Sequence, residues 1–257
     1  MFHYFIIGFI SLLSFSCNSN DKKVNSEKDL NIAEIKISNK LMNSTALTKA
    51  FVLGKFDYSK DSTFTQVNIA FTHKTVFLKK ETYNAFLAMA DSAKKSGITL
   101  AIYSGTRNYV EQKSIWERKW NKYGTLKPLE RVNKILEYSA MPGSSRHHWG
   151  TDIDLNSLNN SYFNRGNGLK VYMWLKNNAN TFGFYQVYTD KSSGRKGYNL
   201  EKWHWSYLPL ASKYLKFYNA EVTSEDIEGF SGSEYAEQVN IIDDYVNGLA
   251  LSVKNYK

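Results

Sequence analysis

Apolar residues recur along the chain with two different periods, which predict alternating helices and short strands from residue 50 onward. In residues 80–95 they return every three or four positions, as on one face of an α-helix, and Gly97 ends the pattern. Residues 129–138 show the same helical period. Residues 98–103 are instead apolar on both faces of a strand, which predicts a central strand of a sheet.

The second half of the chain continues this alternation. Strands are expected at residues 152–155, 184–188 and 203–207, with helices at 171–178 and 210–218. In the first of these strands polar and apolar residues alternate, so it should be half-buried with Asp152 and Asp154 on one face. In residues 235–251 the apolar positions fall in phase, which predicts an amphipathic helix packed on the domain as an accessory element.

The N-terminal segment has the pattern of a targeting signal. Residues 5–15 form an apolar run that is too short to span a bilayer and suits the core of a signal peptide. Cys17, the only cysteine, follows in a setting that resembles the lipobox of bacterial lipoproteins. The resemblance implies a lipoprotein-type signal peptide at 1–17, a lipid on Cys17, and a membrane-anchored protein of the bacterial cell envelope, facing the periplasm or the surface. An ordinary signal peptide and a membrane anchor are the alternatives.

Composition indicates a folded domain that follows a flexible tether. Residues 18–43 are rich in Asn, Ser, Lys and Asp and have no apolar period, as expected of a spacer. The 257 residues are 42% hydrophobic and 15% aromatic, which is enough to form a full core. A formal net charge of +9 favours acidic partners. Because the basic residues are scattered rather than clustered with stacking aromatics, we expect no nucleic-acid binding.

Two short clusters carry the candidate chemistry. His147 and Asp154 lie seven positions apart, and Glu201 precedes His204 by three positions. Two imidazoles and one carboxylate are a ligand set for zinc that leaves a coordination position open for water, and a spare carboxylate can serve as a base. The alternative is a pair of capped turns with buried, hydrogen-bonded histidines.

Neighbouring residues leave part of this assignment open. Asp152 competes with Asp154 for the metal, because a strand places both on the same side. His148 should point away from its neighbour, and His73, beside apolar alternation, is expected to be structural. On an ideal strand Glu201 and His204 would face opposite sides, so Glu201 is expected in the loop that precedes the strand.

Arg107 occupies a position suited to an anion. It follows the strand predicted at 98–103 and precedes a helix for which Asn108 and Glu111 can form a capping box. Its guanidinium, beside free backbone N–H groups at a helix N-terminus, suits a carboxylate. A surface arginine in a solvated turn is the alternative.

The combined pattern Ser-x-His-x6-Asp, from Ser145 to Asp154, followed by Glu-x-Trp-His resembles the signature of VanY-type zinc D-alanyl-D-alanine carboxypeptidases of the peptidase M15 family. The likeness extends over residues 77–215. It implies a single α+β domain at 44–218, of the type shared with the Hedgehog signalling domain, with a mostly antiparallel sheet and flanking helices. Residues 219–257 would then form a C-terminal helical extension, and the protein is expected to be a monomer.

The resemblance also implies roles for individual residues and settles Asp154 over Asp152. It makes one zinc ion the cofactor and Glu201 the catalytic base. The implied zinc ligands are His147, Asp154 and His204, and the implied substrate contacts are Arg107, Ser145 and Gln112. The implied reaction removes the terminal D-amino acid from peptidoglycan stem peptides. An L,D-carboxypeptidase or an endopeptidase acting on the same peptides, and a zinc-containing binding module without activity, are the alternatives.

Overall fold

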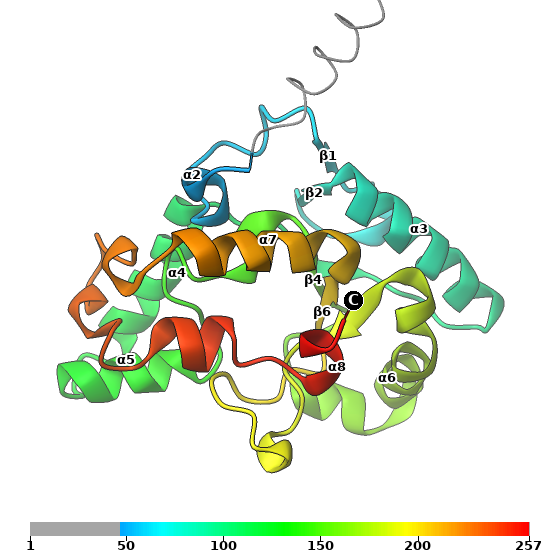
Figure 1. Ribbon diagram of the computed structural model, residues 1–257. Coiled ribbons are helices and arrows are strands. Elements are labelled where there is room, and N and C mark those ends of the chain that lie inside the picture. Colours follow the sequence, from blue (N-terminus) through cyan, green and yellow to red (C-terminus); the bar gives the residue numbers. More distant parts are fainter. Residues whose placement is uncertain (1–46, 257) are drawn as a thin grey trace, which may run out of the picture. The chain divides into compact units, whose positions relative to one another are not determined.

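The computed structural model describes residues 47–256 (Figure 1). The longer helices in this part of the chain are α3 (Lys80–Lys95), α4 (Tyr109–Lys122), α5 (Pro128–Leu136), α6 (Gly166–Asn178) and α7 (Leu208–Glu221). Short helices α2 (Lys49–Val52) and α8 (Leu251–Lys254) lie near its two ends. None of the helices between residues 47 and 256 combines the length and apolar character needed to cross a bilayer.

A four-stranded antiparallel sheet lies at the centre of the domain. Its strands are β3 (Ile102–Ser104), β4 (Asp152–Leu155), β5 (Phe184–Gln186) and β6 (His204–Tyr207), in the spatial order β3-β4-β6-β5. Strands β1 (Phe64–Gln66) and β2 (Phe77–Lys79) form a separate antiparallel pair. The predicted α+β class, with a mostly antiparallel sheet and flanking helices, is confirmed.

One face of the sheet packs against α3 and α6. Ile153 and Leu155 of β4 share an apolar cluster with Phe86 of α3 and Leu175 of α6, and all four are fully buried. Because successive strand residues point to opposite faces, Asp152 and Asp154 point away from this cluster. The apolar packing of β4 therefore decides which way its two carboxylates point.

Residues of helices α4, α5 and α7 form a second apolar cluster. Trp116 of α4, Ile135 of α5 and Leu208 of α7 are buried in it together with Trp149. Ile241, from the region predicted as a C-terminal extension, belongs to the same cluster and is completely buried. Residues 219–256 thus contribute to the core of the domain.

The strand predicted at residues 98–103 differs from the observed one in length and position. Strand β3 covers only Ile102–Ser104 and forms the edge of the sheet, whereas the central strands are β4 and β6. Leu100 and Ile102 are buried against α3, but Tyr103 is 50% exposed. The apolar residues at 98–103 therefore pack on one side, against α3, and the other side of this segment is not covered.

Two further predictions are corrected. Strand β4 is buried on both faces rather than half-buried, because its polar face lines an enclosed site. The single helix predicted at 235–251 is wrong: this region contains a 3-10 turn η7 (Ser233–Tyr235), a π-helical turn η8 (Ile241–Val246) and α8. Asn240 has φ 50°, a left-handed conformation that interrupts a right-handed helix.

Candidate active site

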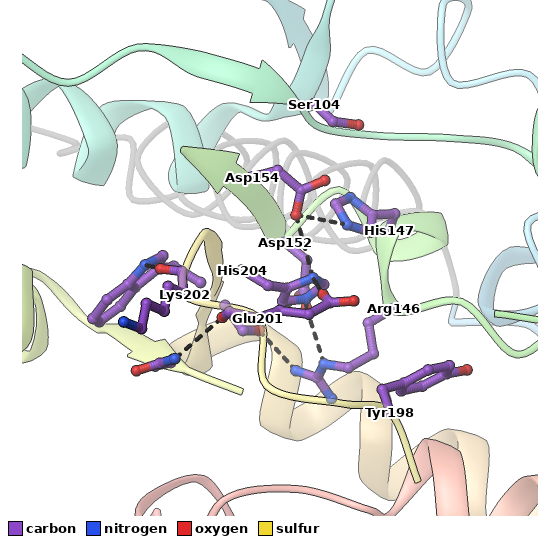
Figure 2. A network of polar contacts seen from close by, with 12 residues as sticks. Ser104, Arg146, His147, Asp152, Asp154, Tyr198, Glu201, Lys202 and His204 are labelled. Atoms are coloured by element: carbon purple, nitrogen blue, oxygen red, sulfur yellow. Dashed lines mark hydrogen bonds and ion pairs between the residues drawn. The ribbon is translucent and has the colours of Figure 1, made fainter. Parts of the chain in front are cut away.

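Three predicted ligands converge on one point, although they come from distant parts of the chain. Register in the sheet places Asp154 of β4 directly opposite His204 of β6, and His147 comes from the 3-10 turn η2 (Arg146–Trp149) just before β4. Asp154 Oδ1 lies 3.4 Å from His147 Nε2 and 3.3 Å from His204 Nδ1. The three ligand atoms lie within 4.8 Å of one another (Figure 2).

In each histidine, the ring nitrogen that faces away from Asp154 is held by a hydrogen bond. His147 Nδ1 lies 2.8 Å from the carbonyl oxygen of Gly105, and His204 Nε2 lies 2.8 Å from Asp152 Oδ2. A nitrogen that donates in this way leaves the other ring nitrogen as a lone-pair ligand. Asp154 Oδ1 is buried without a hydrogen-bond partner. An unsatisfied buried carboxylate oxygen between two imidazole lone pairs fits a bound metal ion.

Glycine is required in the turn between the first two ligands. Gly150 has φ 73°, and a β-carbon at this position would lie 2.4 Å from the ring of Phe64. A larger residue would therefore be strained in its backbone and would also clash. The crowding that the glycine relieves comes from Phe64 and from the backbone of Lys79.

Glu201 lies in the turn before β6, as predicted, with its carboxylate in the same cluster. Its Oε2 is 3.3 Å from His204 Nδ1, and its backbone N–H donates to the carbonyl of Tyr188. The residue is 5% exposed. Burial raises the pKa of Glu201, although His204 acts in the opposite direction. A carboxylate whose pKa is raised in this way is a stronger base than an exposed one, which suits proton transfer.

Arg107 is held in place by hydrogen bonds on two sides. Its Nε donates to Gln112 Oε1 at 2.9 Å, and one terminal nitrogen donates to Ser104 Oγ at 2.7 Å. The same terminal nitrogen is 3.8 Å from Asp154 Oδ2. Gln112 in turn donates to the carbonyl of Ala140, so Gln112 positions the guanidinium. The capping box between Asn108 and Glu111 is present as predicted.

A cleft of about 570 Å³ joins these groups. Its lining includes the predicted residues His147, Asp154, Glu201, His204, Arg107, Gln112 and Ser145. Ser145 is 3% exposed and contributes to the wall beside His147. All seven residues predicted for the metal, the base and the substrate therefore face one cavity. Cys17, the predicted lipidation site, lies outside the described residues.

The family model described as D-alanyl-D-alanine carboxypeptidase, VanY, matches residues 75–210, which is more than half of the chain. The chain belongs to the VanY family. The matched segment contains both clusters of candidate ligands together with Arg107.

Individual relatives are similar to about half of this VanY-family chain. The protein YodJ of Bacillus subtilis (strain 168) is 33% identical over 134 residues, which cover 51% of this chain and 46% of the relative. A D-alanyl-D-alanine carboxypeptidase of Enterococcus faecalis (strain ATCC 700802 / V583) is 27% identical over 138 residues, covering 53% of this chain and 50% of the relative. The chain thus spans about half the length of the curated relatives it matches.

Solved structures match a larger share of the chain than these relatives do. A variant of the D,D-pentapeptidase VanY in complex with Zn(II) has a TM-score of 0.48 at 22% identity. The match covers 67% of this chain and 88% of the chain of that structure. The LD-carboxypeptidase LdcB has a TM-score of 0.49 at 26% identity, and the match covers 72% of this chain and 81% of the LdcB chain. With both TM-scores below 0.5, the backbone overlap is partial.

Asp152 belongs to a buried network behind His204. Its Oδ2 accepts from Arg146 Nε at 2.9 Å and from His204 Nε2, and its Oδ1 accepts from Ser206 Oγ at 2.6 Å and Thr151 Oγ1 at 2.9 Å. A terminal nitrogen of Arg146 also donates to Ser206. Although burial opposes ionisation, Arg146 and His204 hold the pKa of Asp152 well below its usual range. Asp152 therefore orients the candidate ligand His204 (Figure 2).

Sequence patterns did not single out Arg146 or Ser206. Their contribution depends on a buried ion pair and on the register that places Ser206 opposite Asp152. Two further histidines of the described residues lie outside the triad. His148 points away from the triad, with Nδ1 2.7 Å from the carbonyl of Arg107 and Nε2 accepting from the N–H of Gly143. His73 is exposed and is not part of the cluster.

Proposed function

We propose that this protein is a zinc-dependent D-alanyl-D-alanine carboxypeptidase that removes the terminal D-amino acid from peptidoglycan stem peptides. Convergence of His147, Asp154 and His204 beside Glu201, in a cleft that also holds Arg107, carries the proposal. Membership of the VanY family supports it independently.

The arrangement suggests how the peptide bond would be attacked. When bound by the two imidazoles and Asp154, zinc supplies a polarising positive charge that lowers the pKa of a water molecule and activates a carbonyl group. Glu201 would take the proton from the attacking water and donate it to the departing amine. Its burial and raised pKa suit both steps.

Arg107 would restrict cleavage to the C-terminal residue of the peptide substrate. Its guanidinium is oriented by Gln112 and Ser104 and lies close to the triad, at 3.8 Å from Asp154. A guanidinium held in this way would bind the terminal carboxylate of the substrate and align the last peptide bond with Glu201. A peptide without a free C-terminus would lose this contact.

Incubation of the zinc-loaded protein with synthetic stem tetrapeptides and pentapeptides tests the proposal. Release of one D-alanine from the pentapeptide, identified by mass and abolished by a chelator, is the expected result. Release from the tetrapeptide alone would instead identify an L,D-carboxypeptidase, and internal cleavage an endopeptidase. Absence of any zinc-dependent product would overturn the enzymatic assignment in favour of a binding module.

We also propose that a lipid on Cys17 tethers the domain to a membrane of the cell envelope, on the basis of the apolar run at 5–15 and the spacer at 18–43. Substitution Cys17→Ser should move the protein from the membrane fraction to the soluble fraction of fractionated cells. Unchanged partitioning would reject the anchor.

A further inference from the structure

Helix α4 presents a row of side chains to the cleft. Gln112, Ile115 and Lys119 follow the spacing i, i+3, i+7, which places them on one face of the helix, and all three line the cavity. Arg118, an exposed residue next to Lys119, also contributes to the lining. The first residue of the row holds Arg107, so the row begins at the proposed carboxylate clamp and leads away from it.

Lys119 is a cation without a counter-ion. Its ammonium group donates to Ser139 Oγ, and no carboxylate of residues 47–256 lies within the 4.0 Å of an ion pair. Partial burial lowers the pKa of Lys119, and the charge of Glu201 acts against this. A partly desolvated charge without a partner is unfavourable unless an anion reaches it.

Charge is distributed unevenly around the cleft. The acidic residues that line it, Asp154 and Glu201, both belong to the candidate metal site. Its wall at α4 carries Arg118 and Lys119 instead. A substrate with a second negative charge, in addition to its terminal carboxylate, would match this distribution.

We propose that Lys119, with Arg118 at the rim, forms a second anion subsite that binds a side-chain carboxylate of the peptide upstream of the scissile bond. This inference rests on the proposed function, and it specifies the substrate class as stem peptides with an acidic residue near their C-terminus. Ser139 would orient the ammonium group for this contact.

The spacing of the two subsites indicates which substrate residue is involved. Gln112 and Lys119 are seven residues apart on α4, which corresponds to about 10 Å along the helix axis. An extended peptide covers this distance in about three residues. With the terminal carboxylate at Arg107, the third residue from the C-terminus would reach Lys119. In a stem pentapeptide that residue is a diamino acid, either lysine or diaminopimelate.

Lysine and diaminopimelate offer a matched pair of substrates, because they differ by one side-chain carboxylate. We expect the zinc-loaded full chain to hydrolyse the diaminopimelate pentapeptide with a kcat/KM at least about tenfold above that for the lysine pentapeptide. In Lys119→Met this ratio should fall toward one, mainly through a higher KM for the acidic peptide. Lys119→Arg, which keeps the charge, should retain most of the preference.

Lys122→Met is the matched control. It removes the same charge from the same helix, but Lys122 is exposed and does not line the cleft, so the ratio should stay at the wild-type value. A wild-type ratio near one would overturn the subsite, and so would a preference that survives in Lys119→Met. An equal loss in Lys122→Met would assign the preference to long-range attraction rather than to a subsite.

Binding measurements separate this inference from the proposed function. If wild type hydrolyses neither peptide, the proposed function fails. Calorimetric titration of the full chain with both pentapeptides then still tests the subsite. Tighter binding of the diaminopimelate peptide that is lost in Lys119→Met supports it, and equal affinities reject it.

Discussion

At Asp154, one carboxylate oxygen links the two candidate histidine ligands. Oδ1 lies between His147 and His204, is buried, and accepts no hydrogen bond. Burial opposes ionisation, but the two imidazoles hold the pKa of Asp154 well below its usual range. Burial also lowers the pKa of His147. An ionised carboxylate beside a neutral imidazole is the protonation state that binds a divalent metal.

The proposed role of Glu201 predicts a separation of zinc binding from catalysis. Glu201→Ala should keep one equivalent of zinc by metal analysis, because the three ligands remain, but should lose at least about a hundredfold in kcat, since general-base catalysis disappears. Glu225→Ala, an exposed glutamate outside the cleft, is the control and should behave as wild type. Turnover of stem peptides by Glu201→Ala at the wild-type rate would disprove the base assignment.

The proposed clamp predicts a change in substrate affinity. Arg107→Ala should raise KM for peptides with a free C-terminus by about tenfold or more, because a charge-assisted bidentate contact is lost. C-terminally amidated peptides, measured in parallel by product release, should be poor substrates of the wild type. Equal hydrolysis of free and amidated peptides by the wild type would rule out the clamp.

Among the secondary-structure elements, η2, β4 and β6 meet through a buried ion pair. Arg146 comes from η2, Asp152 from β4, and Ser206 and His204 from β6, and hydrogen bonds connect all four side chains. Arg146 and Asp152 are 2% and 0% exposed. A buried charge that loses its partner is strongly destabilising, whereas removal of both charges together can be nearly neutral.

This coupling predicts a double-mutant cycle. Arg146→Met should lower the free energy of unfolding by about 3–5 kcal/mol, because Asp152 is left buried and uncompensated. In Arg146→Met/Asp152→Ala much of this loss should be recovered in denaturant titrations of the metal-free protein. Additive effects of the two substitutions would contradict the coupling.

The same network predicts an effect on metal binding. Asp152→Ala should weaken zinc affinity by about 10–100-fold, since His204 loses the acceptor that selects its tautomer. Competition with a chromophoric chelator measures this affinity. An unchanged dissociation constant would show that His204 is oriented by packing alone.

At the scale of the whole domain, residues 47–256 form two apolar clusters, and some buried titratable groups lie outside the candidate metal site. His148 is completely buried, and its two ring nitrogens connect Arg107 on one side with Gly143 on the other. Burial lowers the pKa of His148 to about 3. Protonation of this ring would therefore require the surrounding structure to open.

His148 predicts an acid-sensitive stability of the metal-free protein. Between about pH 6.5, the pKa of an unfolded histidine, and about pH 3, the unfolded state binds one more proton at this residue. The contribution of His148 is thus complete above about pH 6.5 and declines by about 1.4 kcal/mol per pH unit as the pH falls. In His148→Gln the free energy of unfolding, measured by denaturant titration across this range, should fall less steeply than in wild type. Parallel slopes would refute this assignment.

Patterns of nearby residues were sufficient to predict many of the helices and strands. The helix at residues 80–95 matches α3 at both ends, and the capping box of Asn108 and Glu111 forms as expected. Both features depend on residues within a few positions of each other, so their energetics can be read from sequence. The helix expected at 235–251 failed because burial of the tail along the domain, with Asn240 in a left-handed conformation, outweighed its helical period.

The sequence by itself determined the residue types of the site and their spacing, namely two imidazoles, a carboxylate and a second acidic group in two clusters. Tertiary structure decided the rest. Only the pairing of β4 with β6 shows that Asp154 meets His204 while Asp152 lies behind it, and only folding brings Lys119 of α4 into the same cleft. These arrangements depend on strand register and helix packing, which are set by contacts between residues far apart in the chain.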